Sequence, residues 1–277
     1  MSRRFRVLLL AALLAIAAAS AFALPRASNV PGGIAQVPLG TVLDTPDPPK
    51  AWLGEQPVWV TRENGHWVAV VGVPLDTPAG TKTLRVAASN GERSVDFPVS
   101  AKRYAEQHVR LKDSSKITLS PDDEKRALAE IERIQALKRH WRAEADTDSS
   151  FTQPADGRLS SRFGLRRIFN DQPRAPHSGL DIAVPRGAPI VAAAKGQVLA
   201  VDDYFFNGKT VFVDHGNGLL SMYCHLDRID VKPGDTLRKG QRLGLAGATG
   251  RASGPHLHWS VVLNGTMVDP ELFLRGR

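Results

Sequence analysis

Short apolar runs alternate with turn residues between about Ile34 and Val99. The runs that predict strands cover residues 58–60, 66–71, 84–87 and 95–99. Asn-Gly pairs at 64–65 and 90–91 separate neighbouring runs, and such pairs favour tight hairpin turns because both positions tolerate positive φ. Prolines punctuate the same region and suit loops and sheet edges better than central strands. The pattern predicts a small, sandwich-like antiparallel β-domain over residues 24–103.

One amphipathic helix is predicted over about residues 121–142, inside a linking segment that spans 104–148. Ser120 precedes Pro121 and two aspartates, an arrangement typical of an N-cap, a first helical position and acids that oppose the helix dipole. Apolar residues then recur every three or four positions and form one stripe: Leu128, Ile131, Ile134, Leu137 and Trp141. We expect this stripe to pack on a neighbouring domain.

Glycine-punctuated apolar runs without a helical period begin at Gly157. The runs that predict strands cover residues 189–194, 197–201, 210–213, 219–225, 241–246 and 256–263. Repeated short strands without helices predict a compact antiparallel β-sandwich or barrel. We assign this second β-domain to residues 149–277, and the whole chain is expected to be mainly β with one linking α-helix.

The first residues have the three parts of an export signal. Basic residues (Arg3, Arg4 and Arg6) precede an apolar run over 7–18, and residues 19–23 offer an A-x-A cleavage site. The apolar run is shorter than the ~20 residues that a membrane span needs. We therefore expect a signal peptide over residues 1–23, export, and no stable membrane insertion after cleavage. An uncleaved anchor is the less favoured alternative.

Charge and cysteine content narrow the class further. The chain has 36 basic and 28 acidic residues, a net charge of +8, and removal of three leader arginines leaves 33 against 28, or +5. This mild excess without a dense basic run argues against nucleic acid and fits solubility with weak attraction to anionic wall polymers. Cys224 is the single cysteine, so the fold cannot rely on an internal disulfide. The oligomeric state stays unspecified.

Four histidines and an aspartate in the second β-domain have the composition of a metal site with acid–base neighbours. His177 and Asp181 can supply two ligands. His256 and His258 lie two apart in an apolar strand, so both leave the same face of the sheet, and one of them can complete the site. The helical HExxH motif is absent, so an unligated histidine must serve as general base. The free member of the strand pair and His225 are the candidates.

Three ordered motifs, His177-x-x-x-Asp181, Tyr223-x-His225-Leu226 and His256-Leu257-His258, resemble the LytM/lysostaphin-type zinc endopeptidases that cut peptidoglycan peptides. The resemblance covers roughly residues 157–273. It implies that His177, Asp181 and His258 bind zinc and that His225 and His256 form the catalytic pair. It also implies zinc as the cofactor and peptidoglycan stem peptides as the substrate. Together with the signal peptide, it implies a Gram-negative periplasm.

Other functions remain open at this stage. Some members of the resembled family have lost zinc ligands and activate other wall hydrolases, so an inactive regulator or binding module is the alternative function. A lipoyl- or biotinyl-type carrier fits the histidine cluster poorly. Trp52, Trp59 and Trp67 fit hairpin packing better than a strip that stacks sugars. Coverage of the groove by the N-terminal part is a further hypothesis.

Two neighbours of the site are given structural roles. His215 precedes Gly216-Asn217-Gly218, which is turn chemistry, so we predict a structural histidine rather than a ligand. Cys224 alternates with Tyr223 and His225, so we expect it to be buried and to point away from the histidines. Residues 166–174 and 249–253 are expected to form the walls of the groove because they adjoin the candidate ligands.

Overall fold

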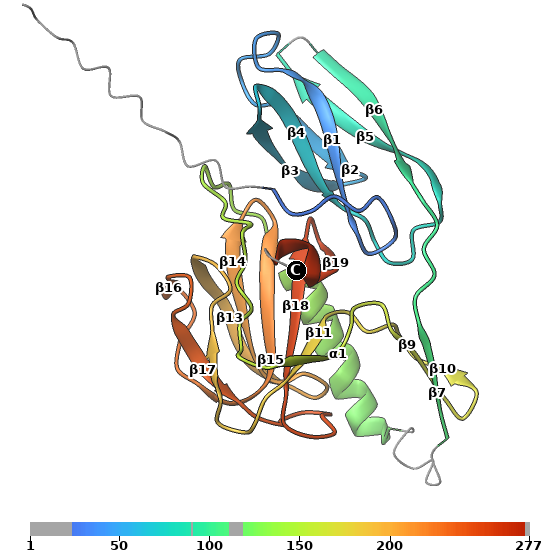
Figure 1. The fold of residues 1–277 in the computed structure, drawn as a ribbon, viewed down its shortest axis with the longest axis vertical. Coiled ribbons are helices and arrows are strands. Elements are labelled where there is room, and N and C mark those ends of the chain that lie inside the picture. The colour runs from blue at the N-terminus through green and yellow to red at the C-terminus, as the bar shows by residue number, and fades with distance from the viewer. Residues whose placement is uncertain (1–23, 90, 111–118, 275–277) are drawn as a thin grey trace, which may run out of the picture.

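The computed structural model describes residues 24–89, 91–110 and 119–274. The fold is mainly β, with one α-helix in the described residues, as the sequence predicts (Figure 1). The predicted signal peptide, residues 1–23, lies outside the described residues. Within the ranges that the structure describes, no helix is long and apolar enough to cross a membrane.

The N-terminal sheet is antiparallel, with the strand order β1-β4-β3-β2-β5-β6. Its strands are β1 (Ile34–Thr41), β2 (Lys50–Leu53), β3 (Gln56–Glu63), β4 (His66–Gly72), β5 (Gly80–Ala88) and β6 (Gly91–Val99). The predicted hairpin joins β3 to β4 through Asn64 and Gly65, whose φ values are +48° and +79°. Trp59 is only 4% exposed and packs in the core, which removes it from any sugar-stacking strip.

The C-terminal sheet runs β16-β13-β14-β15-β18-β11-β8 and curls into a nearly closed, barrel-like form. Its strands are β8 (Arg158–Ser161), β11 (Leu180–Ala183), β12 (Pro189–Val191), β13 (Gly196–Tyr204), β14 (Gly208–Gly216), β15 (Leu219–Ile229), β16 (Thr236–Leu237), β17 (Arg242–Ala246), β18 (Leu257–Leu263) and β19 (Thr266–Val268). A short 3₁₀ helix, η2 (Pro270–Phe273), follows them. The predicted antiparallel barrel or sandwich is confirmed.

Both faces of this sheet are covered. Tyr223 and Trp259 belong to the large core inside the curl, and both are fully buried. Their strand neighbours Met222 and Cys224 belong to a second cluster on the opposite face. Because strand residues alternate between faces, adjacent positions serve different layers. The second face is the one that carries the helix and the candidate site.

Helix α1 (Pro121–Lys138) packs on that second face through Ile134 and Leu137. Its start agrees with the prediction, since the Ser120 side chain accepts a hydrogen bond from the Asp123 N–H at 3.2 Å. Its end differs from the predicted residue 142, because the Arg139 N–H bonds to the carbonyl three residues back and tightens the last turn.

The predicted apolar stripe of α1 is only partly buried. Leu128 and Ile131 are 58% and 43% exposed. The contacting face of the helix instead includes Ala127, which is buried, and Arg126 and Arg133, which reach polar groups of β13. Polar contacts thus form a portion of the helix–sheet contact that the sequence pattern assigned to apolar side chains.

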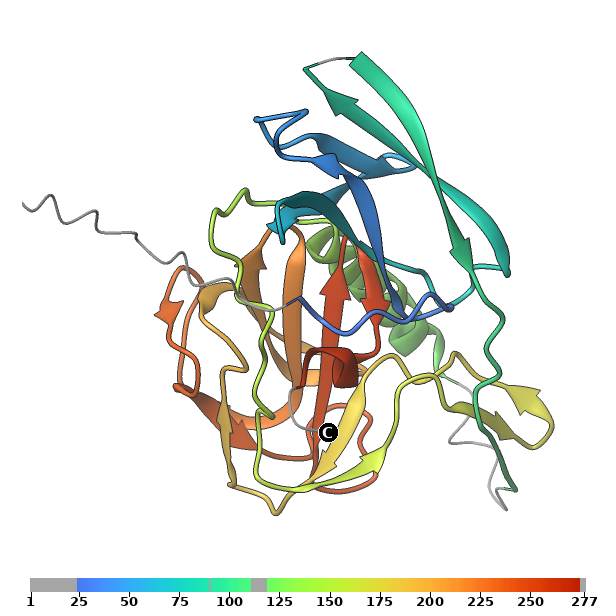
Figure 2. The same ribbon diagram turned by 45° about the horizontal axis from the view of Figure 1, so that its top comes forward.

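A small third sheet links the two parts of the chain. Strand β7 (Glu106–Val109), inside the predicted linker, pairs in parallel with β9 (Arg166–Phe169), which pairs with β10 (Gln172–Pro173). Figure 2 shows the N-terminal sheet and this small sheet on different sides of the barrel-like sheet. Residues 166–174, predicted as a loop in the groove wall, thus contain the strands β9 and β10. Asn264 joins the two large sheets by accepting from the Gly72 N–H at 2.7 Å.

Candidate metal centre

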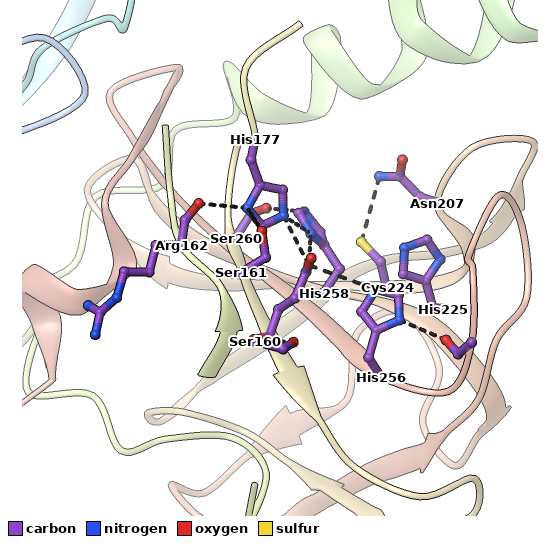
Figure 3. Close-up of polar contacts among 12 residues, drawn as sticks. Ser160, Ser161, Arg162, His177, Asn207, Cys224, His225, His256, His258 and Ser260 are labelled. Atoms are coloured by element: carbon purple, nitrogen blue, oxygen red, sulfur yellow. Dashed lines mark hydrogen bonds and ion pairs between the residues drawn. The ribbon is translucent and has the colours of Figure 1, made fainter. Parts of the chain in front are cut away.

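A row of polar side chains crosses four neighbouring strands on the outer face of the C-terminal sheet. The register pairs Cys224 of β15 with His258 of β18, His258 with Asp181 of β11, and Asp181 with Ser161 of β8. Residues directly opposite in an antiparallel ladder project from the same face. The register alone therefore places His258 and Asp181 side by side. His177, from the segment before β11, completes the group (Figure 3).

Three candidate ligand atoms converge in this group. Asp181 Oδ1 lies 2.9 Å from His177 Nε2 and 2.9 Å from His258 Nδ1, and the two nitrogens are 3.0 Å apart. Gly179 permits this approach, because a Cβ there would lie 2.5 Å from the Trp259 carbonyl oxygen. The three side chains are only 10% to 14% exposed. Their atoms are thus largely shielded from solvent.

Hydrogen bonds on the far side of the two imidazoles orient the rings, and one of them indicates which nitrogen carries the proton. His177 Nδ1 lies 2.9 Å from the Arg162 carbonyl oxygen, which can only accept. We therefore assign the proton to Nδ1, which leaves the Nε2 lone pair directed at Asp181. His258 faces Asp181 with the opposite nitrogen, Nδ1, and its Nε2 lies 2.9 Å from Ser260 Oγ, a hydroxyl that can accept the Nε2 hydrogen. Such outer partners orient metal-ligating histidines.

The electrostatics favour the protonation states that a metal requires. Burial lowers the pKa of His258 and keeps the ring neutral. Burial opposes ionisation of Asp181, but the close approach of the His177 and His258 rings outweighs it and holds the pKa of that carboxyl well below its usual range. Neutral imidazole and ionised carboxylate are the ligand forms of zinc sites. The donor set of two histidines and one carboxylate therefore fits zinc.

His225 and His256 lie beside this group as a second pair. Their ring centroids are 4.8 Å apart, and His256 Nε2 is 3.8 Å from Asp181 Oδ1. Each donates its Nδ1 hydrogen to a backbone carbonyl at 2.8 Å, His225 to Thr249 and His256 to Gly254. Both Nε2 atoms are thus left as lone pairs available to accept a proton. Burial lowers the pKa of His225 to about 4, so its ring is neutral at neutral pH.

The backbone at His225 departs from ordinary strand geometry. Its φ is +61°, and the register of β15 shifts in this region. Leu226 consequently lies in the inner core, while Cys224 and His225 both lie on the outer face. The expectation that Cys224 points away from the histidines was therefore wrong, because it assumed unbroken alternation. Its burial was predicted correctly, and burial raises the pKa of the thiol to about 12.

His215 has the structural role predicted for it, although it lies in β14 rather than in the turn. It faces the inner core, where its ring is 4.8 Å from that of Phe151. Its Nδ1 hydrogen bonds to the Lys195 carbonyl at 2.7 Å, and its Nε2 lies 2.8 Å from Ser221 Oγ. The ring is thus on the opposite side of the sheet from the candidate ligands.

Several supporting residues carry no sequence signal of their own. Ser161, Ser260, Asn207 and Thr249 contact the site histidines or their backbone, yet each is a common polar residue in an unremarkable context. Only the pairing of distant strands and turns brings them to the site. Arg167 of the predicted groove wall also reaches it, donating to Ser161 Oγ at 3.1 Å.

Comparison with known proteins places this geometry in a family. Residues 175–270 match "Peptidase family M23", and residues 27–102 match "Peptidase family M23 N-terminal domain". A Pseudomonas aeruginosa protein assigned to peptidase M23 has a crystal structure with 44% identical sequence and a TM-score of 0.75, over 89% of this chain and 95% of that one. The chain belongs to peptidase family M23. The resemblance seen in the sequence motifs is thereby confirmed.

Curated relatives include two Vibrio cholerae serotype O1 proteins. Peptidoglycan DD-endopeptidase ShyA is 41% identical over 40% of this chain and 26% of its own length, and peptidoglycan DD-endopeptidase ShyB is 30% identical over 65% and 52%. The chain thus spans about a quarter to half of these relatives. The M23 match contains the candidate ligands and the second histidine pair, whereas helix α1 lies between the two matched regions.

Proposed function

We propose that this chain is an exported zinc metalloendopeptidase that hydrolyses peptide cross-links of peptidoglycan. The observation that carries the proposal is the convergence of His177 Nε2, Asp181 Oδ1 and His258 Nδ1 within 2.9–3.0 Å of one another. The relatives named as peptidoglycan DD-endopeptidases support the substrate class. In this proposal the three residues bind zinc, and His225 and His256 are catalytic.

Zinc, when bound, supplies Lewis acidity and lowers the pKa of water to near neutrality. The residues of the chain supply the proton transfers. One Nε2 lone pair, that of His225 or His256, accepts the proton of the attacking water. That ring then gives the proton to the departing amine nitrogen, and the other ring, after taking up a proton from solvent at Nε2, donates to the oxyanion that develops on the scissile carbonyl. The carbonyl oxygens of Thr249 and Gly254 hold both rings in the tautomer that these roles need.

Location and domain division follow from the same proposal. Cleavage near Ala23 would release the mature chain into the periplasm, where stem peptides are accessible. Residues 24–103 would form the β-domain, 104–148 the link with α1, and 149–277 the catalytic part. Sequencing of the mature N-terminus from the periplasmic fraction checks the first point, and a start at Met1 would contradict it.

The test of the activity is digestion of purified sacculi by the mature protein. We expect loss of peptide cross-links, identified by the masses of the released fragments, with inhibition by chelator and recovery on zinc addition. His258→Ala serves as the matched negative control. Intact sacculi in the presence of stoichiometric zinc would favour the alternative of an inactive regulator of other wall hydrolases.

A further inference from the structure

Helix α1 contacts the turn that joins β13 to β14, although the helix lies outside both matched regions. Glu130 is the central residue of this contact. Its Oε2 accepts the backbone N–H of Phe205 at 2.6 Å, and its Oε1 accepts from Arg126 Nε at 2.7 Å. Arg126 also donates to the Asp203 carbonyl at 3.0 Å. The Glu130 side chain is only 13% exposed, so its bond to the Phe205 N–H is partly shielded from water, whereas the Arg126 side chain is 53% exposed.

The β13–β14 turn that Glu130 contacts also bonds to the backbone of His225. The Asn207 carbonyl accepts the His225 N–H at 2.8 Å, and Asn207 Nδ2 lies 3.6 Å from Cys224 Sγ (Figure 3). His225 has a φ of +61°, a conformation that is unfavourable for a side chain with a Cβ and persists only where its surroundings impose it. The Asn207 carbonyl is one of the contacts that impose it.

The same turn also fixes the segment that orients the His225 ring. The Arg251 N–H bonds to the Phe206 carbonyl at 2.9 Å, and the Lys209 N–H bonds to Thr249 Oγ1 at 2.9 Å. The two backbones touch closely, because a Cβ at Gly208 would lie 2.3 Å from the Thr249 carbonyl carbon. Thr249 is the residue whose carbonyl receives the Nδ1 hydrogen of His225. The backbone bond of His225 to Asn207 and its ring bond to Thr249 therefore both depend on this turn.

We propose that α1 is a positioning element of the catalytic site and that Glu130 is its positioning residue. Glu130 touches neither the candidate metal ligands nor the proposed reacting atoms. It acts by holding the turn at residues 205–208, which fixes the backbone and ring of His225. The catalytic consequence rests on the proposed function, whereas the structural consequence for His225 does not.

The catalytic test compares Glu130→Ala, Glu130→Gln and a control. Glu130→Ala removes the acceptor for the Phe205 N–H, and we expect kcat to fall roughly 10- to 100-fold with KM little changed, as for a misplaced catalytic group. Glu130→Gln keeps an acceptor oxygen and restores most of kcat. Arg133→Ala is the control, because it removes a 2.6 Å ion pair between α1 and Asp202 of β13 without touching the turn. Its kcat stays at the wild-type value.

Hydrogen exchange at the His225 amide tests the positioning separately from catalysis. In Glu130→Ala this amide, which bonds to Asn207, exchanges about tenfold faster than in the wild type, whereas Arg133→Ala leaves its rate unchanged. Urea unfolding of each variant shows whether the effect is local. A Glu130→Ala protein with wild-type kcat and a wild-type exchange rate overturns the proposal. An equal fall in kcat in Glu130→Ala and Arg133→Ala also overturns it. A wild type that hydrolyses no cross-links refutes the proposed function, but the exchange comparison still decides the role of Glu130.

Discussion

Protonation of His215 should destabilise the protein between neutral and mildly acidic pH. The ring is 2% exposed, and burial lowers its pKa from 6.5 to about 4, although the Lys195 carbonyl and the nearby Asp214 and Asp148 oppose the shift. Each pKa unit corresponds to about 1.4 kcal/mol, so charging this buried ring costs about 3 kcal/mol. The unfolded chain binds the proton more readily. The stability that the neutral His215 ring contributes to the folded protein is therefore fully retained above pH 6.5 and is lost as the pH falls towards 4.

The assay is urea unfolding of the wild type and His215→Gln at about pH 7 and about pH 4, both treated with chelator. The glutamine can still donate to the Lys195 carbonyl and accept from Ser221, but it does not titrate. We expect the free energy of unfolding of the wild type to fall by about 3 kcal/mol more than that of the variant. Other titrating groups, including His225, cancel in this difference. Parallel losses in the two proteins would refute the assignment of the shift to burial of His215.

Three further results are expected. His225→Ala should retain bound zinc while the rate of cross-link hydrolysis falls roughly 100- to 10,000-fold, whereas Asp181→Ala should lose the metal. The zinc content of both variants is measured, and loss of zinc from His225→Ala would contradict the proposed roles. Cys224, fully buried and with its pKa raised to about 12, should react with iodoacetamide only after unfolding; rapid labelling of the native protein would contradict its burial. Asn264→Ala removes two hydrogen bonds to Gly72 and should cost about 1–3 kcal/mol of stability, and unchanged urea midpoints would speak against this link.

The overall fold could be predicted because local patterns and the final structure agree. The Asn64-Gly65 turn and the Ser120 cap depend on chemistry within a few residues, and both formed as expected. The shared face of His256 and His258 follows from strand alternation in the same way. Register could not be predicted, since it depends on which distant strand pairs with which. The row from Cys224 to Ser161 is therefore visible only in the structure.

The errors in the sequence interpretation have the same origin. The bulge at His225 reverses alternation and brings Cys224 to the site face, and a single-strand pattern contains no sign of it. The helix stripe was misjudged because Arg126 and Glu130 contact the turn after β13 and leave Leu128 exposed. Long-range polar contacts decided both cases, and hydrophobic periodicity does not report them.

Zinc titration of the chelator-treated protein, with a defined cross-linked muropeptide dimer as substrate, tests the central claim most directly. The hydrolysis rate and the bound zinc are measured on the same samples, beside His258→Ala. We predict that activity rises in proportion to zinc, reaches its limit at one zinc per chain, and stays absent in the variant. Full hydrolysis by wild-type protein without bound zinc, or none at full zinc occupancy, would contradict the account.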